Sequence, residues 1–177
     1  SSSFPRSRGD LTVEFLLAST TPHNYTSTIN PDQFAGFNFI AFDGRELIYT
    51  TNRTGDTRIL EPGIYGLTNT HLDDPWPKST RGVRKLTNAI VRPVLSDLID
   101  LLKMDEPLSS LANSLDDEST VVEQRTSPGF IRGGVYGTRA STAVILERDK
   151  FLFCEQAFES KGRATKRIEE IVLLENQ

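Results

Sequence analysis

The feature that most constrains this chain is a short segment, Phe37–Phe42, whose apolar side chains would point to both sides of an extended backbone. Successive side chains of a strand alternate between the two faces of a sheet. Every second residue from Phe37 would share one face, while Ile40 and Phe42 would share the other. The pair Asp43-Gly44 predicts a tight hairpin turn, with Glu46–Asn52 as the returning strand. Because both faces are apolar, we expect a sheet that is covered on both sides.

A change of period marks the helical part of the chain. Between Thr80 and Lys103 apolar residues recur at steps of three and four, which predicts one face of a long helix. Pro93 lies inside this pattern and cannot donate a backbone hydrogen bond, so we expect the helix to kink or divide there. A shorter helix is predicted from Asp10, which can cap it, to Ala18.

The remaining segments are predicted as strands and loops. Extended pieces are expected at Arg58–Leu60, Ile64–Asn69, Val135–Leu146, Phe151–Phe158 and Ala164–Leu174, the last by a weak preference for strand over short helix. Loops are expected at Thr20–Pro31 and, with an acidic composition, at Asp105–Ser119. About six mostly antiparallel strands with one long and one short helix describe an α+β sheet domain.

Composition excludes several classes of protein. The 177 residues suit about one domain, and 20 basic against 24 acidic residues argue against a general nucleic-acid or anionic-membrane binder. A single cysteine excludes an internal disulfide framework and multi-cysteine zinc or iron–sulfur sites, so we expect no metal site. No apolar run is long enough for a transmembrane helix.

Two polar residues stand on predicted apolar strand faces. Asn69 closes one strand on the side of Tyr65, and Arg139 begins another on the side of Ala143. An amide or a guanidinium buried there needs a partner, because unpaired burial is costly. Periodicity alone favours an ordinary structural hydrogen bond or ion pair. The alternative is a polar constellation in which the amide polarises a carbonyl group and the arginine holds a carboxylate or an oxyanion.

Other chemically reactive residues give weaker signals. Cys154 lies inside a predicted strand, which favours a buried structural thiol over a nucleophile. His71 follows Asn69 closely and could reach a site, although a surface role in a loop is the favoured interpretation. Nothing in the spacing of these residues and Met104 supports axial ligation of haem.

Several strings of residues resemble the Transport and Golgi organisation 2 family, also called the NRDE family. They are Gly36–Ala41, the string Leu60–Asn69 followed by Pro75–Lys78, and the Tyr-Gly-Thr-Arg string at 136–139. Arg8–Leu11 is also similar to the segment that precedes the family's short helix. The order and spacing of these strings agree over nearly the whole chain.

The resemblance implies that residues 1–177 are the C-terminal two-thirds of a member, as a single domain that is incomplete at its N-terminus. Family members begin with Met-Cys and carry an Asn-Arg-Asp-Glu motif soon afterwards, and this chain has neither. Asn52–Gly55 shares two letters with that motif but lies in another region, so the motif is not carried over to it.

The family is similar to N-terminal-nucleophile hydrolases, which implies an αββα sandwich of mostly antiparallel sheets. In the related acylases an N-terminal cysteine attacks an amide, assisted by a downstream asparagine and arginine, which Asn69 and Arg139 match by position. From the matching strings, Tyr65, Trp76 and Thr138 are expected to contribute to binding. Without the N-terminal cysteine this chain lacks the nucleophile.

The resemblance implies a role in Golgi organisation, protein secretion and haem or lipid homeostasis, in the cytoplasm or associated with the Golgi or mitochondria. A small hydrophobic or acyl ligand, or haem, would be the partner, and no cofactor is otherwise evident. Two alternatives stay open. One is an N-terminal-cysteine amide or thioester hydrolase whose nucleophile lies on a segment outside this sequence. The other is a stand-alone interaction module.

Overall fold

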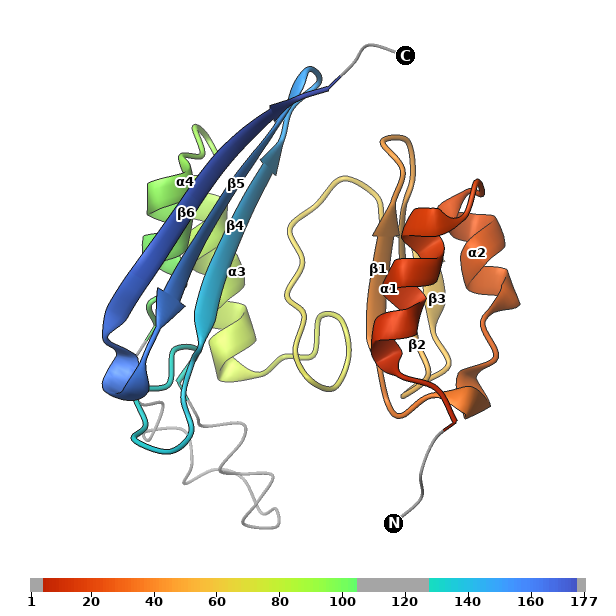
Figure 1. The fold of residues 1–177 in the computed structure, drawn as a ribbon, viewed down its shortest axis with the longest axis horizontal. Coiled ribbons are helices and arrows are strands. Elements are labelled where there is room, and N and C mark those ends of the chain that lie inside the picture. The colour runs from red at the N-terminus through yellow and green to blue at the C-terminus, as the bar shows by residue number, and fades with distance from the viewer. Residues whose placement is uncertain (1–4, 105–127, 175–177) are drawn as a thin grey trace. The chain divides into compact units, whose positions relative to one another are not determined.

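The chain divides into two compact units, Ser1–Asp74 and Pro75–Gln177, and the computed structural model describes residues 5–104 and 128–174 of it (Figure 1). In the described residues each unit holds one three-stranded antiparallel sheet and two α-helices. The predicted mixed α+β class is therefore confirmed. The predicted loop at Asp105–Ser119 lies outside the described residues, and the single-domain sandwich stays a prediction.

The first unit begins with helices and continues with its sheet. Its elements are α1 (Arg8–Leu17), α2 (Pro22–Thr28), the short 3₁₀ helix η1 (Pro31–Gln33), β1 (Asn38–Phe42), β2 (Leu47–Thr51) and β3 (Thr57–Ile59). The helix predicted from Asp10 is present, but its cap is Ser7, whose hydroxyl accepts from the Gly9 N–H at 3.2 Å. Asp10 instead reaches back to the Ser7 N–H at 3.3 Å and completes a capping box.

Helix α2 corrects the prediction of a loop at Thr20–Pro31. Thr21 caps it by accepting from the Asn24 N–H at 3.2 Å, and Pro22 occupies the first helical turn, where its missing N–H costs nothing. The cap signals were in the sequence, but the polar composition of the segment concealed them. The last turn of α2 is followed by η1.

The predicted hairpin is confirmed. β1 and β2 pair antiparallel with Phe42 opposite Leu47, and Gly44 between them adopts a φ of 92°. Asp43 holds the turn, because its Oδ1 accepts from the backbone N–H groups of Arg45 at 2.9 Å and Glu46 at 3.0 Å. These two donors lower the pKa of Asp43, with the Glu46 bond the larger cause.

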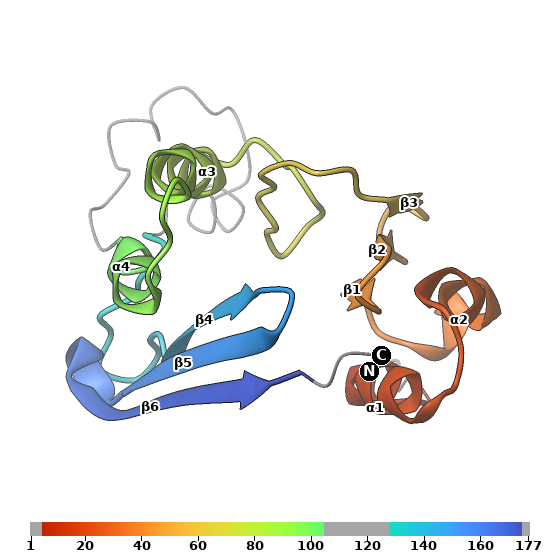
Figure 2. The ribbon, with the colours of Figure 1, turned by 90° about the horizontal axis from the view of Figure 1, so that it is seen from above.

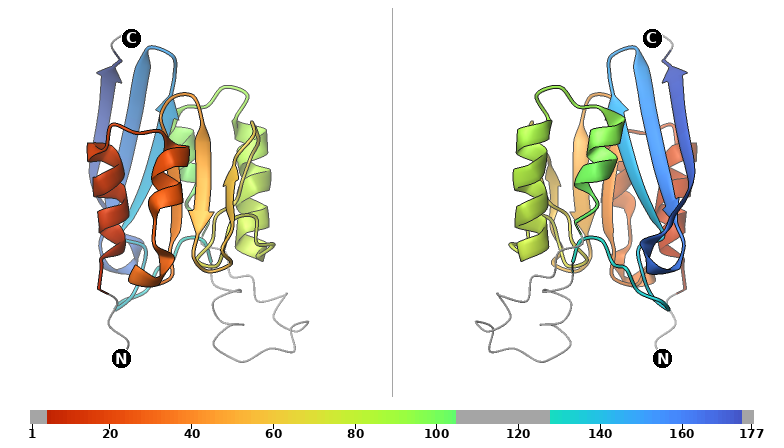
Figure 3. Two further views of the ribbon diagram at one scale, coloured as in Figure 1. Left: turned by 90° about the vertical axis from the view of Figure 1, so that its right-hand side faces the viewer. Right: turned by 90° about the vertical axis from the view of Figure 1, so that its left-hand side faces the viewer.

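The two faces of this sheet are buried to different extents by the rest of the first unit. On one face Phe39 packs with Phe15 of α1 and Tyr25 of α2, and the two helices lie side by side against it (Figure 3). On the other face Tyr49 packs with Leu60 and Leu72 of the segment that follows β3. The expectation of cover on both sides therefore holds for β2 but not for the whole of β1, where Ile40 and Phe42 are each 42% exposed.

The second unit carries its helices before its sheet. Its elements are α3 (Pro77–Ala89), α4 (Leu95–Leu101), β4 (Ala140–Leu146), β5 (Lys150–Phe158), the 3₁₀ helix η3 (Ser160–Gly162) and β6 (Ala164–Leu173). The predicted long helix divides around Pro93, as expected. Both predicted strands that end the chain are present, whereas the one predicted from Val135 begins only at Ala140.

Helix α4 covers one face of the sheet, whose order is β4-β5-β6 (Figure 2). Ile99 of α4 is fully buried against Ala143 and Cys154. The register places Ala143, Cys154 and Glu169 in one cross-strand row on that face, and Ile145, Leu152 and Ile171 in the next. Because rows of a sheet share a face, the sheet presents these residues together to α4.

Candidate functional site

Asn69 lies at a bend in the irregular segment that follows β3, and its side chain is exposed. A strand was expected over Ile64–Asn69, but the only ladder contact there is a single bridge between Leu67 and Leu72. The expectation that Asn69 stands on a buried strand face is therefore wrong. Pro62-Gly63 and the reversal after Asn69 explain the difference, because they leave no length for regular pairing.

A buried hydrogen-bond network nevertheless fixes the segment that carries Asn69. The Tyr49 hydroxyl, at 0% exposure, donates to Asn38 Oδ1 at 2.8 Å and accepts from the Leu72 N–H at 3.1 Å. Asn38 Nδ2 then donates to the carbonyl oxygen of Thr68 at 3.2 Å. Asn38 and Tyr49 thus hold the backbone on both sides of Asn69, which fixes the position of the Asn69 Cα atom.

Next to Asn69 the segment gathers a polar cluster. The Thr70 hydroxyl donates to Asp74 Oδ2 and lies 2.7 Å from the Thr68 hydroxyl. His71 Nε2 lies 3.7 Å from Asp74 Oδ2, and the Asp74 side chain is only 14% exposed. A histidine beside a sheltered carboxylate is an arrangement suited to proton transfer. The sequence indicated that His71 could reach a site, but it did not indicate this carboxylate.

Arg139 belongs to the second unit and follows a tight glycine-rich loop. Thr138 closes that loop, because its hydroxyl accepts from the Ile131 N–H at 2.9 Å and its own N–H donates to the Ile131 carbonyl at 3.0 Å. The side chain of Arg139 is exposed, which corrects the expectation of a buried guanidinium on a strand face. Its backbone carbonyl accepts from Phe158 at 2.8 Å, so the start of β4 is anchored to β5.

The other two residues expected at a binding site are both partly or wholly buried. Tyr65 packs against the Tyr49 cluster, and its hydroxyl donates to the Glu61 carbonyl at 2.6 Å. Trp76 is 4% exposed, and among the described residues its Nε1 finds no hydrogen-bond partner. Lys78 lies 4.9 Å from the centre of its ring, and burial lowers the pKa of that lysine.

The structure brings the five predicted residues into two groups. Tyr65 and Asn69 share one segment of the first unit, whereas Trp76, Thr138 and Arg139 belong to the second. Their proposed roles stay predictions.

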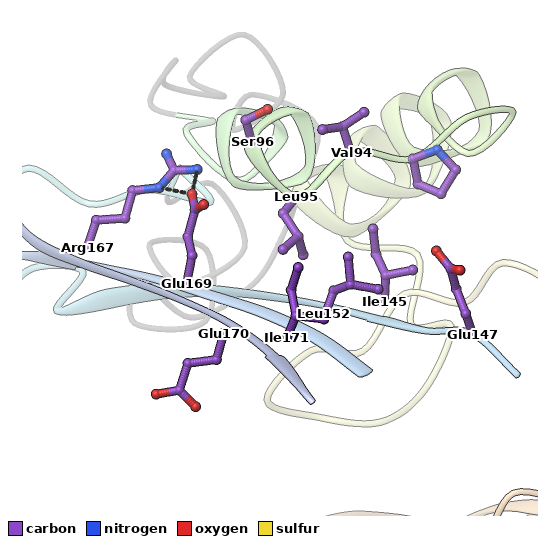
Figure 4. A pocket seen from close by; sticks show the side chains of 11 residues that line it. Val94, Leu95, Ser96, Ile145, Glu147, Leu152, Arg167, Glu169, Glu170 and Ile171 are labelled. Carbon is purple, nitrogen blue, oxygen red and sulfur yellow. Dashed lines mark hydrogen bonds and ion pairs between the residues drawn. The ribbon is translucent and has the colours of Figure 1, made fainter. Parts of the chain in front are cut away.

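A pocket that sequence reasoning did not find lies in the second unit, between the start of α4 and the sheet (Figure 4). Its volume is about 400 Å³. Leu95 of α4 faces the cross-strand row of Ile145, Leu152 and Ile171, and these side chains form an apolar floor. None of the five predicted residues lines it. The signal in the sequence was the alternation of β4, β5 and β6, but only their register shows that three apolar residues share one row.

The polar edge of this pocket consists of paired charges. Arg167 donates through Nε to Glu169 Oε1 at 2.6 Å, and this bond raises the pKa of the arginine. Glu147 accepts from Lys150 Nζ at 3.0 Å. Glu169 also lies 3.8 Å from the Sγ of Cys154, which is fully buried as predicted. Among the described residues that line the pocket, the one cation, Arg167, is therefore already paired.

Across residues 5–104 and 128–174, no group of three or more His, Cys, Asp and Glu side chains is arranged to hold a metal ion. In the same residues, no helix combines the length and the apolar character needed to cross a bilayer.

The fold and these sites define an α+β protein of two antiparallel sheets, each with helices on one face. The chain belongs to the Transport and Golgi organisation 2 family, whose sequence profile matches residues 1–160. This confirms the resemblance of the motif strings. No solved structure matches the chain, so the fold of N-terminal-nucleophile hydrolases stays a prediction.

Individual relatives agree with the family assignment. The chain is 27% identical over 162 residues to the Transport and Golgi organization protein 2 homologs of Homo sapiens and Bos taurus. It is 26% identical over 160 residues to the Mus musculus Transport and Golgi organization 2 homolog. These matches cover 80–81% of this chain but only 58–59% of the relatives, so the chain spans about three-fifths of their length.

Proposed function

We propose that this protein serves Golgi organisation and protein secretion, and with them lipid or haem homeostasis, by binding a small hydrophobic ligand in the pocket under α4. The family and the names of its relatives support the cellular role. The pocket supports the binding role, because its apolar floor lies beside a polar edge, which is the usual form of a small-molecule site. The location that goes with this role is the cytoplasm, the Golgi surface or mitochondria.

An acyl chain fits this pocket better than haem does. The floor consists of Leu95, Ile145, Leu152 and Ile171, and each methylene group buried against them would contribute about 0.8 kcal/mol. Haem is usually held by an axial histidine, cysteine, methionine or tyrosine, and the pocket lining contains none of these.

The edge of the pocket selects the head group of that ligand. Glu169 already occupies the guanidinium of Arg167, and Lys150 is paired with Glu147. A free carboxylate would compete with Glu169 for the guanidinium of Arg167. A neutral ester, thioester or amide could accept a hydrogen bond without breaking an ion pair, so the proposed ligand is an acyl group with a neutral head.

The test is a binding titration with two probes that share one alkyl chain, one ending in a carboxylate and the other in its methyl ester. We expect one probe per chain and several-fold tighter binding of the ester. Equal or tighter binding of the carboxylate would contradict the head-group argument. Failure of both probes to bind would contradict the proposed function.

A second candidate is assistance in acyl-amide or thioester hydrolysis by Asn69 and Arg139. The observation that favours it is the fixed segment around Asn69, where His71 lies beside the sheltered Asp74 carboxylate. The reaction needs an N-terminal cysteine that this sequence does not contain. Acyl-amide turnover by a chain extended through the upstream reading frame, lost in both Asn69→Ala and Arg139→Ala, would support it. Absence of turnover would dismiss it.

A further inference from the structure

Strand β6 is the last strand in the order of its sheet. It pairs with β5 on one side only, and among the described residues no strand pairs with its other side. All ten of its residues except Ile168 are exposed, including Ile171 at 66% and Leu173 at 76%. A long edge strand with apolar residues is a template for pairing with another strand, unless the protein blocks it.

The charges of β6 are arranged with opposite signs about its centre. Lys166 and Arg167 precede Ile168, and Glu169 and Glu170 follow it. If two copies of β6 pair antiparallel about a two-fold axis at Ile168, Lys166 stands opposite Glu170 of the second copy, and Arg167 opposite its Glu169. Each pair occurs twice by symmetry. Directly opposite residues share a face, so all four pairs are favourable cross-strand neighbours.

Neighbouring registers are less favourable. A shift of two positions in one direction places Arg167 opposite Arg167, and in the other direction it places Glu169 opposite Glu169. Like charges directly opposite one another destabilise a strand pair. A shift of one position leaves a single type of charge pair and sets either Arg167 or Glu169 opposite Ile168. The charges of β6 therefore disfavour pairing in general and permit one register.

Two of these charges have no other partner in the described residues. No hydrogen bond or ion pair joins the Lys166 or Glu170 side chain to another described side chain, and Figure 4 shows Glu170 on the face away from Arg167 and Glu169. Arg167 and Glu169 already pair within the strand and would join a four-charge group across the axis. We propose that β6 binds β6 of a second copy of this chain, antiparallel and centred on Ile168, so that the two sheets become continuous.

The experiment measures the mass of the full chain in solution by sedimentation and light scattering, at low salt and over a wide range of concentration. We expect the wild-type protein to approach twice its 19.8 kDa monomer mass. Lys166→Glu and Glu170→Lys should each return the mass to that of a monomer, because each sets like charges opposite one another. The double variant Lys166→Glu/Glu170→Lys should dimerise again, as should an equimolar mixture of the two single variants.

Lys85→Glu, on an exposed position of α3, makes the same change of net charge as Lys166→Glu but away from the edge, and it should remain dimeric. Circular dichroism and thermal unfolding identify any variant that fails to fold, and the two single variants test the same contact independently. A protein that is monomeric at every concentration would overturn the proposal. So would a dimer that the single reversals leave intact, or one that the double reversal does not restore.

Discussion

At the scale of single residues, the structure depends on polar atoms that are buried and fully paired. Tyr49 is the clearest case, because its hydroxyl both donates and accepts inside the first unit. Through Asn38 the same network fixes the backbone of the segment around Asn69. A buried donor or acceptor that loses its partner carries its full desolvation cost. Removing this hydroxyl should therefore cost more stability than the net value of the hydrogen bonds it makes.

We therefore expect Tyr49→Phe to lower the free energy of unfolding by about 1–3 kcal/mol, because it leaves the Leu72 N–H unpaired. Urea denaturation measures the loss, and hydrogen exchange at the Leu72 amide should become faster. Tyr65→Phe is the matched control, since its hydroxyl bonds a carbonyl oxygen that water can reach and its removal should cost about 1 kcal/mol or less. Equal losses in the two variants would contradict the network's role.

Asp43 gives a prediction for pH. Its pKa in the folded protein lies below the value of about 3.9 expected in the unfolded chain, because two N–H donors stabilise the carboxylate. Its stabilisation is complete above the unfolded pKa and is lost as the pH falls through the folded pKa. Asp43→Asn keeps an acceptor but does not titrate. The difference in stability between wild type and variant should therefore shrink in acid, and a constant difference would refute this.

At the scale of elements, the loop before β4 shows how close backbone contacts set the first residue of a strand. β4 starts at Ala140 because the preceding loop closes through Thr138 and Ile131. A Cβ atom on Gly133 would press against the carbonyl oxygen of Tyr136, whereas one on Gly134 would meet nothing within 4 Å. The two glycines are neighbours in sequence, but only Gly134 has room for a Cβ atom.

Gly133→Ala should therefore destabilise the protein by about 1–3 kcal/mol, while Gly134→Ala should change stability by no more than about 0.5 kcal/mol. Thermal unfolding of the two variants under identical conditions provides the comparison. If Gly134→Ala were as harmful as Gly133→Ala, the loop would not have the conformation described.

Local signals in the sequence predicted most elements of the fold. Asp43-Gly44 predicted the hairpin and Pro93 predicted the break between α3 and α4, because each acts within a few residues. The same reasoning missed α2, where a cap at Thr21 outweighed a polar composition, and placed Asn69 in a strand that does not form. The pocket depends on the register of three strands, which no local pattern contains.

At the scale of the whole molecule, two compact units carry separate candidate sites. The fixed segment of Asn69 and His71 belongs to the first unit, and the apolar pocket belongs to the second. The chain belongs to the Transport and Golgi organisation 2 family and spans about three-fifths of its relatives' length, and the cellular role given above is a proposal. The central claim is that the pocket under α4 holds an acyl group, and this claim concerns the second unit alone.

Two neighbouring residues of β6 provide the most direct test of that claim. Ile171 forms part of the pocket floor, whereas Val172 does not line the pocket and is 48% exposed. In a titration with an alkyl methyl-ester probe, Ile171→Asp should weaken binding by about tenfold or more, which is roughly 1.4 kcal/mol, because it places a charge among apolar groups. Val172→Asp should bind like wild type. Equal affinity of the two variants, or no binding by the wild-type protein, would contradict the claim.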